Sequence, residues 1–456
     1  MAGAAWPPLA GVELPTLRTE VPGPRSRALA ARLAAVESRN ITRIADDGPI
    51  FWDEARAACV RDADGNTYID LTAGFGVAMA GHCNPRVAGA IARQAARLPH
   101  ALGDVHPAEP KVALLEKLAR LAPGDLAVSI LASAGAEAVE AALKTALLRT
   151  GRPGILAFEG GYHGLTYGAL AATSRAEFRA PFEAQLFPAV SFASFPAATP
   201  ADSATRREDE AIAGVETLLA DAERGSYPIG TILVEPVQGR GGIVVPTPGF
   251  LARLRRLCDG ERCLLIFDEV YTGFGRTGAW FACEHARVQP DLLIVGKALT
   301  GSIALSAAIG SPATMSAWPP SAGEAIHTST FLGNPVACSA ALAQIEEIEE
   351  HALVERAAAI GATIRARAER WTATIAGVAE ARGIGLLQGV ELRDAAGAPH
   401  GRRALEVCRR LLRRGVLLLA EGPEAAVLAI TPPAVITEAQ LAHALDEVDR
   451  ALHQTA

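Results

Sequence analysis

The chain has 456 residues, of which half are hydrophobic and a fifth are charged, which excludes a disordered chain and indicates a globular protein with a large core. The formal net charge is −7, no block of basic residues is present and no apolar run is as long as a membrane span, so neither nucleic acid nor a membrane is expected as a partner. Seven cysteines without a C-x-x-C pair predict reduced thiols in a cytoplasmic protein and no metal site.

The N-terminal part is expected to form an arm followed by a hairpin. Residues 1–24 are rich in Ala, Gly and Pro and lack the basic start and apolar stretch of a signal peptide, so we interpret them as a flexible arm. Two strand-like runs follow, Ala58–Arg61 and Thr67–Leu71, and the turn Asp64-Gly65-Asn66 between them predicts a β-hairpin. We expect residues 25–70 to form the N-terminal part of a small domain.

Residues 71–340 have the pattern of a large α/β domain. Helical stretches such as Ala136–Leu148 and Phe250–Leu257 separate short apolar runs that are typical of buried strands. The runs are Val128–Leu131, Ile155–Phe158, Ile232–Val234, Leu264–Phe267 and Leu292–Val295. This alternation predicts a mostly parallel sheet flanked by helices, in which ligands bind beyond the carboxyl ends of the strands.

Residues 341–456 predict a smaller α+β domain at the C-terminal end. The expected elements are a helix over Pro335–Glu350, a second helix to about Trp371, strands at Leu386–Leu392 and Val416–Leu419, and a last helix over Glu438–Leu452. The predicted fold class is therefore α/β, with a large domain and a smaller α+β domain.

Only four of the 43 basic residues are lysines, which narrows the search for a reactive amine. Lys111, Lys117 and Lys144 lie in amphipathic helical patterns and are expected to be solvated. Lys297 instead follows the apolar run Leu292–Val295 and one glycine. It is either a charge at the rim of the sheet or a desolvated amine whose lowered pKa suits Schiff-base chemistry.

The ends of neighbouring strands supply what the aldehyde cofactor pyridoxal phosphate requires besides a lysine. Asp268 is a candidate partner for the pyridine nitrogen, the alternative being a loop or capping aspartate. The segment Ser133–Ala136 leads into a helix whose free N–H groups attract phosphate. Tyr162 is either a lid over the cofactor ring or a packed core residue. Their joint presence at successive strand ends favours the cofactor.

A series of specific motifs surrounds these strand ends. They are Glu137–Lys144, Tyr162-His163-Gly164, Glu235–Gly239, Phe267–Val270, Thr272–Gly278, Gly296–Leu299 and Ser329–Pro335. Together they closely resemble class III aminotransferases, the ω-aminotransferase group of fold-type I pyridoxal phosphate enzymes, and the resemblance runs from about Pro49 to the C-terminus. It implies the fold-type I transferase architecture and an obligate homodimer with shared active sites.

The resemblance also implies a role for each matching residue. Lys297 would form the aldimine with the cofactor and then move the substrate proton, and Asp268 would pair with the pyridinium nitrogen. The other cofactor-binding residues would be Gly135, Ala136, Tyr162, His163, Glu235, Val270, Tyr271 and, from the neighbouring subunit, Thr330. Tyr162 and Val270 would enclose the cofactor ring between them.

One motif points to a different cofactor and is rejected. Gly273–Gly278 has the G-x-G-x-x-G spacing of dinucleotide-binding proteins. Such a site requires a helix that opens at the motif and an acidic residue at the end of the next strand. Residues 279–283 do not open clearly as a helix, and Asp291 begins the next strand instead of ending it.

The positions expected to bind substrate depart from the family. Many members bind substrate carboxylates with two arginines, and this chain has Leu165 and Ala429 at those positions. The glutamate that pairs with the second arginine is replaced by Arg240, and a glutamine near the cofactor is replaced by Tyr271. We expect Arg240 to bind the substrate carboxylate, the alternative being a solvated loop residue. Phe75 is also expected to contact substrate.

The missing arginines bear on the choice of substrate. Without two cationic anchors, 2-oxoglutarate is a less suitable amino acceptor than pyruvate or a similar monoacid. His327 either lines the pocket across the dimer interface or is a packed histidine.

The predicted activity is ping-pong transfer of an amino group from an amino acid or ω-amino compound to a keto acid. A racemase or epimerase is the nearest alternative, because the same fold and lysine serve both reactions. A binding or regulatory protein on a decayed enzyme scaffold is disfavoured because Lys297 and Asp268 are both present.

Overall fold

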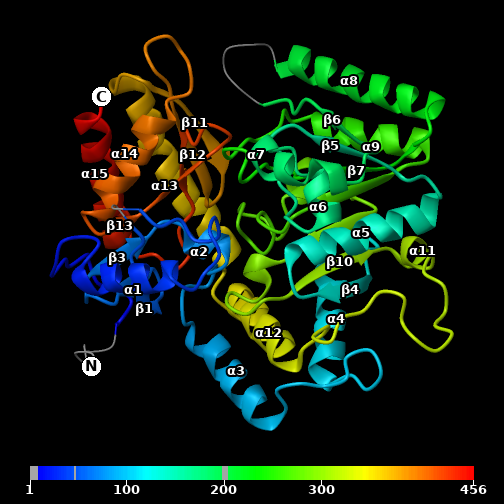
Figure 1. Cartoon of the computed structure of the whole chain (residues 1–456), viewed down its shortest axis with the longest axis horizontal. Helices are drawn as coiled ribbons and strands as arrows, with labels where there is room; N and C mark the ends of the chain where they lie inside the picture. The colour runs from blue at the N-terminus through cyan, green and yellow to red at the C-terminus, as the bar shows by residue number, and fades with distance from the viewer. Residues whose placement is uncertain (1–8, 46–47, 198–203) are drawn as a thin grey trace.

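The computed structural model describes residues 9–45, 48–197 and 204–456. We call the part around its seven-stranded sheet the large domain and the part around two four-stranded sheets the small domain. Figure 1 shows the small domain, formed by the two ends of the chain, beside the large domain formed by its middle. In the part of the chain that the structure describes, no helix is long and apolar enough to cross a membrane.

The seven-stranded sheet confirms the predicted α/β architecture. Its strand order is β4-β10-β9-β8-β7-β5-β6. The bounds are β4 Val128–Ala132, β5 Gly154–Phe158, β6 Val190–Ala193, β7 Ile229–Val234, β8 Leu264–Asp268, β9 Leu292–Val295 and β10 Ser306–Gly310. Strands β9, β8, β7, β5 and β6 pair in parallel, whereas β10 is antiparallel to both neighbours. All five predicted runs are present, and β6 and β10 are additional because their small and polar residues interrupt any apolar run.

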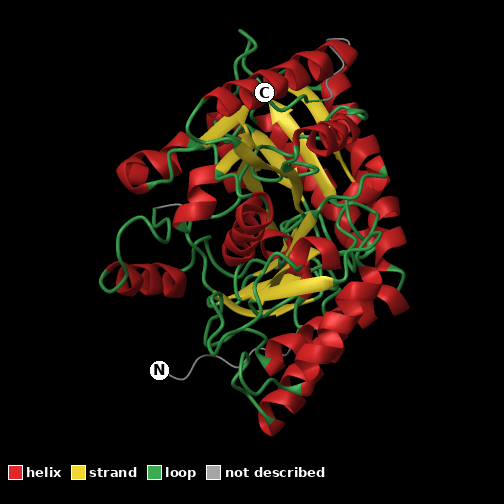
Figure 2. Ribbon diagram, turned by 90° about the vertical axis from the view of Figure 1, so that its right-hand side faces the viewer, coloured by secondary structure: helices red, strands yellow, loops and turns green. Residues whose placement is uncertain are grey.

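Helices on both faces of this sheet explain why its strands are apolar throughout (Figure 2). Leu233 and Ile266 pack with α5 on one face. Their neighbours Ile232 and Leu265 belong to the larger core, which includes α8 and α9 on the other face, because successive strand residues point to opposite sides. The helices of this part are α4 Glu109–Leu121, α5 Gly135–Thr150, α6 Tyr167–Ala172, α7 Ala176–Arg179, η1 Ala180–Gln185, α8 Ala204–Arg224, α9 Phe250–Glu261, α10 Cys283–Ala286, η2 Lys297–Leu299 and α11 Pro312–Met315.

The small domain joins residues from both ends of the chain. One sheet has the order β1-β2-β3-β13 and the other the order β11-β12-β15-β14. The bounds are β1 Trp52–Arg56, β2 Cys59–Asp62, β3 Thr67–Asp70, β11 Val378–Ile384, β12 Leu387–Leu392, β13 Val416–Leu417, β14 Leu419–Glu421 and β15 Val427–Ile430. The remaining helices are α1 Pro24–Ala34, α2 Ala73–Gly76, α3 Pro85–Arg97, α12 Pro335–Glu350, α13 Leu353–Thr374, α14 Gly401–Leu412 and α15 Glu438–Gln454. Antiparallel pairing of β2 with β3 confirms the predicted hairpin.

The predicted single strand over Val416–Leu419 is wrong, because the structure has two strands there. Val416 in β13 pairs in parallel with Ile69, whereas Leu419 in β14 pairs antiparallel with Ala429. The chain therefore passes from one sheet to the other within this apolar run. Hydrophobicity alone does not reveal the change because both strands are largely apolar.

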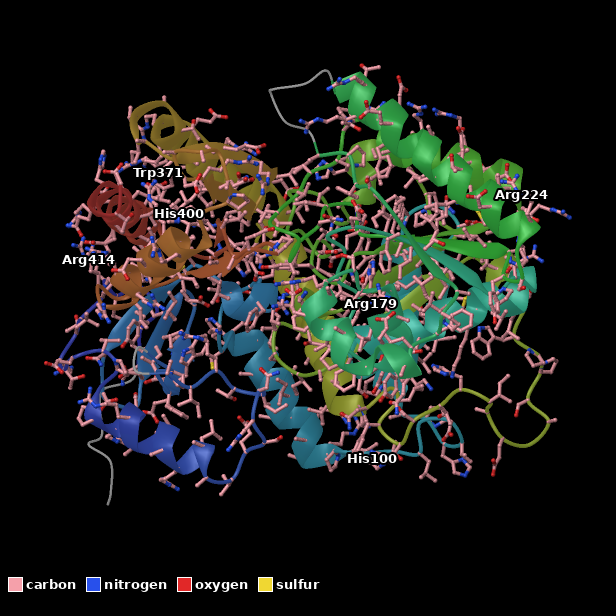
Figure 3. The ribbon with its side chains drawn as sticks, turned by 45° about the horizontal axis from the view of Figure 1, so that its top comes forward. His100, Arg179, Arg224, Trp371, His400 and Arg414 are labelled. Carbon is pink, nitrogen blue, oxygen red and sulfur yellow. The ribbon has the colours of Figure 1, made fainter. Side chains whose placement is uncertain are left out.

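Three residues labelled in Figure 3, Trp371, His400 and Arg414, stabilise the helices of the small domain. Trp371 of α13 is 1% exposed, and its Nε1 donates a hydrogen bond to Asp449 Oδ1 of α15 at 2.8 Å. Arg414, between α14 and β13, pairs with Glu447 of α15 at 3.0 Å. His400 caps α14 by accepting a hydrogen bond from the backbone. The apolar residues of the small domain, Trp371 among them, form one continuous core with those of the large domain.

The domain boundaries remain a prediction. Residues 1–8 of the expected arm lie outside the described residues. From Leu9 onward the chain contacts the small domain, because the Leu9 N–H donates to Glu54 at 2.8 Å and Thr16 pairs with Thr67. Helix α12 continues without a break through residue 340, where the large domain is predicted to end.

Candidate active site

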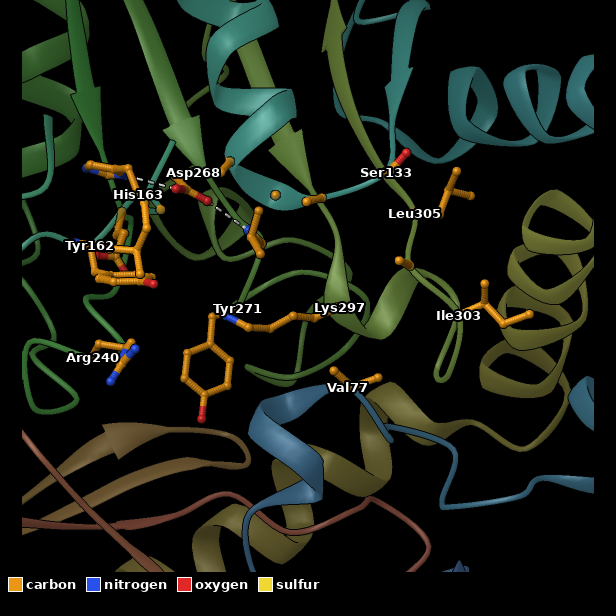
Figure 4. A pocket seen from close by; sticks show the side chains of 18 of the residues that line it. Val77, Ser133, Tyr162, His163, Arg240, Asp268, Tyr271, Lys297, Ile303 and Leu305 are labelled. Carbon is orange, nitrogen blue, oxygen red and sulfur yellow. Dashed lines mark hydrogen bonds and ion pairs between the residues drawn. The ribbon is translucent and has the colours of Figure 1, made fainter. Parts of the chain in front are cut away.

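A cavity of about 490 Å³ lies where β4, β5, β7, β8 and β9 end, at the edge at which parallel sheets bind ligands. Its polar side chains converge from successive strand ends (Figure 4). Lining residues include Ser133, Ala134, Gly135 and Ala136 after β4, Tyr162, His163, Gly164 and Leu165 after β5, Glu235 and Arg240 after β7, Asp268, Val270 and Tyr271 at the end of β8, and Lys297 after β9.

Lys297 is held in this cavity by an unusual backbone conformation. Its φ of 42° lies in the left-handed region, which L-residues rarely adopt, so the surrounding structure must fix it. Its Nζ lies 4.2 Å from the centroid of the Tyr271 ring. Burial lowers the pKa of Lys297, and the charges of Asp268 and Glu235 oppose that shift. The result is an amine that is easier to deprotonate than a solvated lysine.

Asp268 is oriented by a buried histidine. His163 Nδ1 lies 2.8 Å from Asp268 Oδ2, and both residues are buried. The other oxygen, Oδ1, accepts a hydrogen bond from the Val270 N–H at 3.1 Å. These contacts fix the direction of the carboxylate and place it in the wall of the cavity.

A second carboxyl group, that of Glu235, supports the loops around the cavity. It accepts hydrogen bonds from the Tyr162 N–H at 2.9 Å and the Gly239 N–H at 3.0 Å. Burial raises its pKa to about 7, with the charge on Asp268 adding to the effect. Glu235 thus connects the segments that carry Tyr162 and Arg240.

Helix α5 presents its N-terminus to the cavity. Ala134, the residue before the helix, makes no side-chain cap, so its first N–H groups are available to an anion and the helix dipole favours negative charge there. A Cβ on Gly135 would lie 3.2 Å from both methyl groups of Val270, so a glycine keeps this approach open. The site therefore fits pyridoxal phosphate, with an anion cradle, a fixed carboxylate and a buried amine around one cavity.

Tyr271 occupies space that two glycines leave free. A Cβ on Gly76 would lie 2.2 Å from Tyr271 Cε2, and a Cβ on Gly239 would lie 2.2 Å from Tyr271 Cδ1. The ring is therefore confined between α2 and the loop after β7. In this position it faces Lys297.

Arg240 extends across the mouth of the site. Its guanidinium carbon lies 4.7 Å from the centroid of the Tyr162 ring and 5.7 Å from that of Phe178. Its Nε is 3.7 Å from Glu421 Oε2. Arg240 is thus neither buried nor freely solvated, since its side chain is 34% exposed.

Most of the predicted site residues meet in the cavity. Three of them do not line it, namely Phe75, Thr330 and Ala429. Phe75 and Thr330 are exposed, and Ala429 is buried in a small cluster with Ile243 and Leu387. Sequence reasoning assigned no role to Val77, Ser302, Ile303, Ala304 and Leu305, which also line the cavity. The only feature of the sequence that could have identified residues 302–305 as lining residues is their position between Lys297 and the next strand.

The other lysines only partly match their expected environment. The expectation that Lys111 is solvated is wrong, because its Nζ donates to the Gly103 carbonyl at 2.6 Å and burial lowers its pKa. Lys117 pairs with Glu349 at 2.7 Å. Lys144 Nζ lies 3.1 Å from Nδ1 of His327, which therefore has a partner within its own chain. None of these three lysines lines the cavity of Lys297.

Comparison with known proteins identifies the family. The aminotransferase class-III family model matches residues 42–452. The chain is a class III aminotransferase. A 4-aminobutyrate aminotransferase of Mycobacterium leprae is 35% identical over 448 residues, covering 96% of this chain and 97% of that protein. A putrescine aminotransferase of Pectobacterium atrosepticum is 36% identical, covering 90% and 83%.

Solved structures of aminotransferases have the same fold. An (S)-enantioselective omega-transaminase from Thermomicrobium roseum superposes with a TM-score of 0.86 at 28% identity, covering 94% of this chain and 98% of that one. The ornithine aminotransferase of Toxoplasma gondii gives a TM-score of 0.82 at 28% identity, with 94% of each chain covered.

These relationships confirm four predictions about this class III aminotransferase: the family, the fold-type I architecture, transamination and pyridoxal phosphate as cofactor. They do not favour the racemase alternative, because the relatives are named for transamination. The G-x-G-x-x-G segment Gly273–Gly278 forms turns instead of opening a helix, which agrees with the rejection of a dinucleotide site.

Proposed function

We propose that Lys297 is the amine that holds the cofactor and moves the substrate proton. The observation that carries this assignment is its placement in one cavity with the His163–Asp268 pair and the N-terminus of α5. Its lowered pKa supports the role, because an amine must be deprotonated to act as nucleophile and base.

Each neighbouring residue has a task in this proposal. The N–H groups of Gly135 and Ala136 bind the phosphate. Asp268, oriented by His163, pairs with the ring nitrogen, and Tyr162 and Val270 contact the ring faces. When bound, pyridoxal phosphate supplies a carbonyl carbon for the amino group and a ring that withdraws electrons from the substrate carbon.

Lys297 acts as the proton carrier after the substrate amine has displaced it. Its Nζ would then take the proton from the substrate carbon, hold it in the ammonium form and deliver it to the carbon that was the carbonyl carbon of the cofactor. The face of the Tyr271 ring stabilises the ammonium form while the proton is held, because an aromatic face attracts a cation.

The substrate is proposed to carry a carboxylate that Arg240 binds. Arg240 lines the cavity and has a planar donor group suited to carboxylates. 4-Aminobutyrate, named for the Mycobacterium leprae relative, has such a group away from its amine. With a single arginine in this position, we propose pyruvate or a similar monoacid as acceptor.

A homodimer with shared sites is proposed from the exposed surface around Thr330. Residues 98–112 contact residues 328–334 at several points, and large apolar side chains of these two segments are exposed although water contact is unfavourable for them, namely Leu98 (39%), Leu102 (57%), Val105 (64%), Val112 (49%) and Phe331 (63%). Their burial by a second copy would bring Thr330 to the partner's cofactor. A cytoplasmic location is proposed as well, supported by seven free cysteines.

The proposal is tested with a panel of donors and acceptors on the wild type and on Arg240→Met. We expect KM for 4-aminobutyrate and pyruvate to rise about tenfold in the variant, which is the effect of losing one charge-assisted contact, with KM for a plain alkylamine unchanged. An equal rise for the plain amine would contradict a carboxylate-binding role. Absence of amino transfer with every pair would contradict the proposed substrates.

A further inference from the structure

Glu421, which no motif indicates, stands opposite Arg240 in the structure. Arg240 belongs to the loop after β7 of the large domain, and Glu421 is the last residue of β14 in the small domain. The Glu421 side chain is 7% exposed, against 34% for Arg240, and only Arg240 lines the cavity. A substrate entering the cavity therefore meets the guanidinium and not the carboxylate.

The backbone around Arg240 is anchored to the small domain. The Gly422 N–H donates to the Arg240 carbonyl at 3.1 Å, and Arg382 Nη2 donates to the Gly242 carbonyl at 2.8 Å. These contacts fix the backbone of the loop, so a movement of Arg240 on substrate binding would be a movement of its side chain. The Tyr162 ring, 4.7 Å from the guanidinium, gives that side chain an aromatic surface along which it can turn.

The contact between the two charges is loose. Nε and Oε2 are 3.7 Å apart, whereas charge-assisted hydrogen bonds between such groups are about 2.7–2.9 Å long. Nε of Arg240 is buried without a hydrogen-bond partner among the described atoms. A substrate carboxylate that forms a close bidentate contact can therefore compete with Glu421 for the guanidinium.

Separation of the pair has an electrostatic cost at Glu421. Burial raises the pKa of Glu421, and Arg240, Arg175 and Lys297 oppose that shift in this order. Tyr271 and Cys408 are the other titratable groups that its charge affects. When Arg240 turns towards a substrate, Glu421 loses the cation that opposes the shift most.

We propose that Glu421 determines substrate specificity by competing with the substrate carboxylate for Arg240. The ion pair of Arg240 with Glu421 stays intact with a plain amine, which has no carboxylate to bind Arg240. It separates when a substrate carboxylate binds the guanidinium better than Glu421 does. This inference rests on the proposed role of Arg240 as the carboxylate anchor.

The test measures binding of an unreactive carboxylate to the holoenzyme by calorimetry. The probe is propionate, and propionamide of the same size without charge is its control ligand. We expect Glu421→Gln to bind propionate about three- to tenfold more tightly than the wild type, because it keeps the shape and removes the competing charge. Propionamide binding is expected to stay the same. In turnover, KM for pyruvate should fall while KM for a plain alkylamine does not change.

Two further glutamate variants make the result specific. Glu424→Gln alters an exposed glutamate three residues away and is expected to bind propionate like the wild type. Glu421→Asp keeps the charge but withdraws the carboxylate, so an intermediate gain is expected, and this variant carries the test if the glutamine variant does not fold. Unchanged or weaker propionate binding in the folded Glu421 variants would overturn the inference.

Arg240→Met separates failure of this inference from failure of the proposed function. Loss of propionate binding in that variant supports Arg240 as the anchor whatever Glu421 does. Wild-type affinity in Arg240→Met would overturn the anchor, and the inference with it.

Discussion

At the scale of single residues, Lys297 combines two conditions that a reactive amine needs. Burial lowers its pKa, and the left-handed backbone at φ 42° fixes where the side chain starts. An arginine could not replace it as a Schiff-base amine, because a guanidinium stays protonated in proteins. The proposed role of Lys297 therefore gives a chemical reason why the bias of the chain towards arginine does not extend to this position.

Lys297→Arg is expected to abolish covalent attachment of the cofactor and to lower kcat by at least about 10³-fold, because the proton carrier is lost. Mass spectrometry after borohydride reduction should find cofactor mass on the wild type and none on the variant. The control is Lys117→Arg, in which the ion pair of a half-buried lysine with Glu349 can be kept. Retention of reduced cofactor on Lys297→Arg would rule out Lys297 as the attachment site.

The sequence predicted the residues of the site where local chemistry was sufficient. Asp268, His163 and Lys297 follow apolar strands, and the carboxyl ends of parallel strands meet at one edge. Glu421 could not be found in this way, because its contact with Arg240 depends on how the two domains meet. The lining residues 302–305 are small or apolar and carry no chemical signal.

At the scale of elements, the turn segment between β8 and α10 is a rigid support for the site. Glu269 accepts hydrogen bonds from the Cys283 N–H at 2.8 Å and Thr272 Oγ1 at 2.9 Å, which close the segment on itself. Arg276, fully buried, donates to the Pro432 carbonyl at 2.7 Å and so ties the segment to the small domain. The G-x-G-x-x-G motif here serves packing between domains.

The buried carboxyl of Glu269 predicts a pH dependence of stability. Burial raises its pKa from 4.5 to about 7, so between these values the folded state binds a proton that the unfolded state releases. The contribution to stability is therefore largest at low pH and is lost as pH rises through about 7, by up to about 3 kcal/mol.

The measurement compares Glu269→Gln with the wild type by chemical denaturation at several pH values and constant cofactor concentration. The free energy of unfolding of the wild type, minus that of the variant, should decrease as pH rises from about 5 to 8. Glu261→Gln, at an exposed position, should show no such trend. A constant difference for Glu269→Gln would mean that Glu269 does not titrate in this range.

Helices and strands could be predicted where the hydrophobic pattern follows burial. They could not be predicted where an apolar run passes from one sheet to another. The buried strands β5, β8 and β9 and the helix α12 match their expected positions closely, whereas β7 begins three residues before the expected run. The short strand β10 is built from small residues, and β13 and β14 share one apolar run. Which sheet a strand joins is decided by contacts distant in sequence.

At the scale of the whole molecule, the proposed dimer completes each site with Thr330 of the other subunit. Thr330 is exposed and adjacent to Phe331, which is itself 63% exposed and lies 5.4 Å from His100 between ring centroids. Residues in such a region are suited to contact a second copy, because a symmetric interface uses the same surface twice.

Heterodimers of two inactive variants test this arrangement. Lys297→Ala removes the amine, and Thr330→Asp places a negative charge against the cofactor phosphate. A heterodimer with one copy of each, purified through two different tags, should have about half the wild-type activity, because one of its two sites contains neither change. If Thr330 served the site of its own chain, both sites would be defective and the heterodimer inactive.

The parallel pairing of β13 with β3 has a consequence for biosynthesis. Val416 must pair with Ile69, so the N-terminal hairpin cannot complete its sheet until most of the chain has left the ribosome. All seven strands of the large domain precede Val416 in the chain and are available earlier. Until β13 has been synthesised, β3 keeps an open edge that can pair with another nascent chain, which makes early termination of translation a route to aggregation.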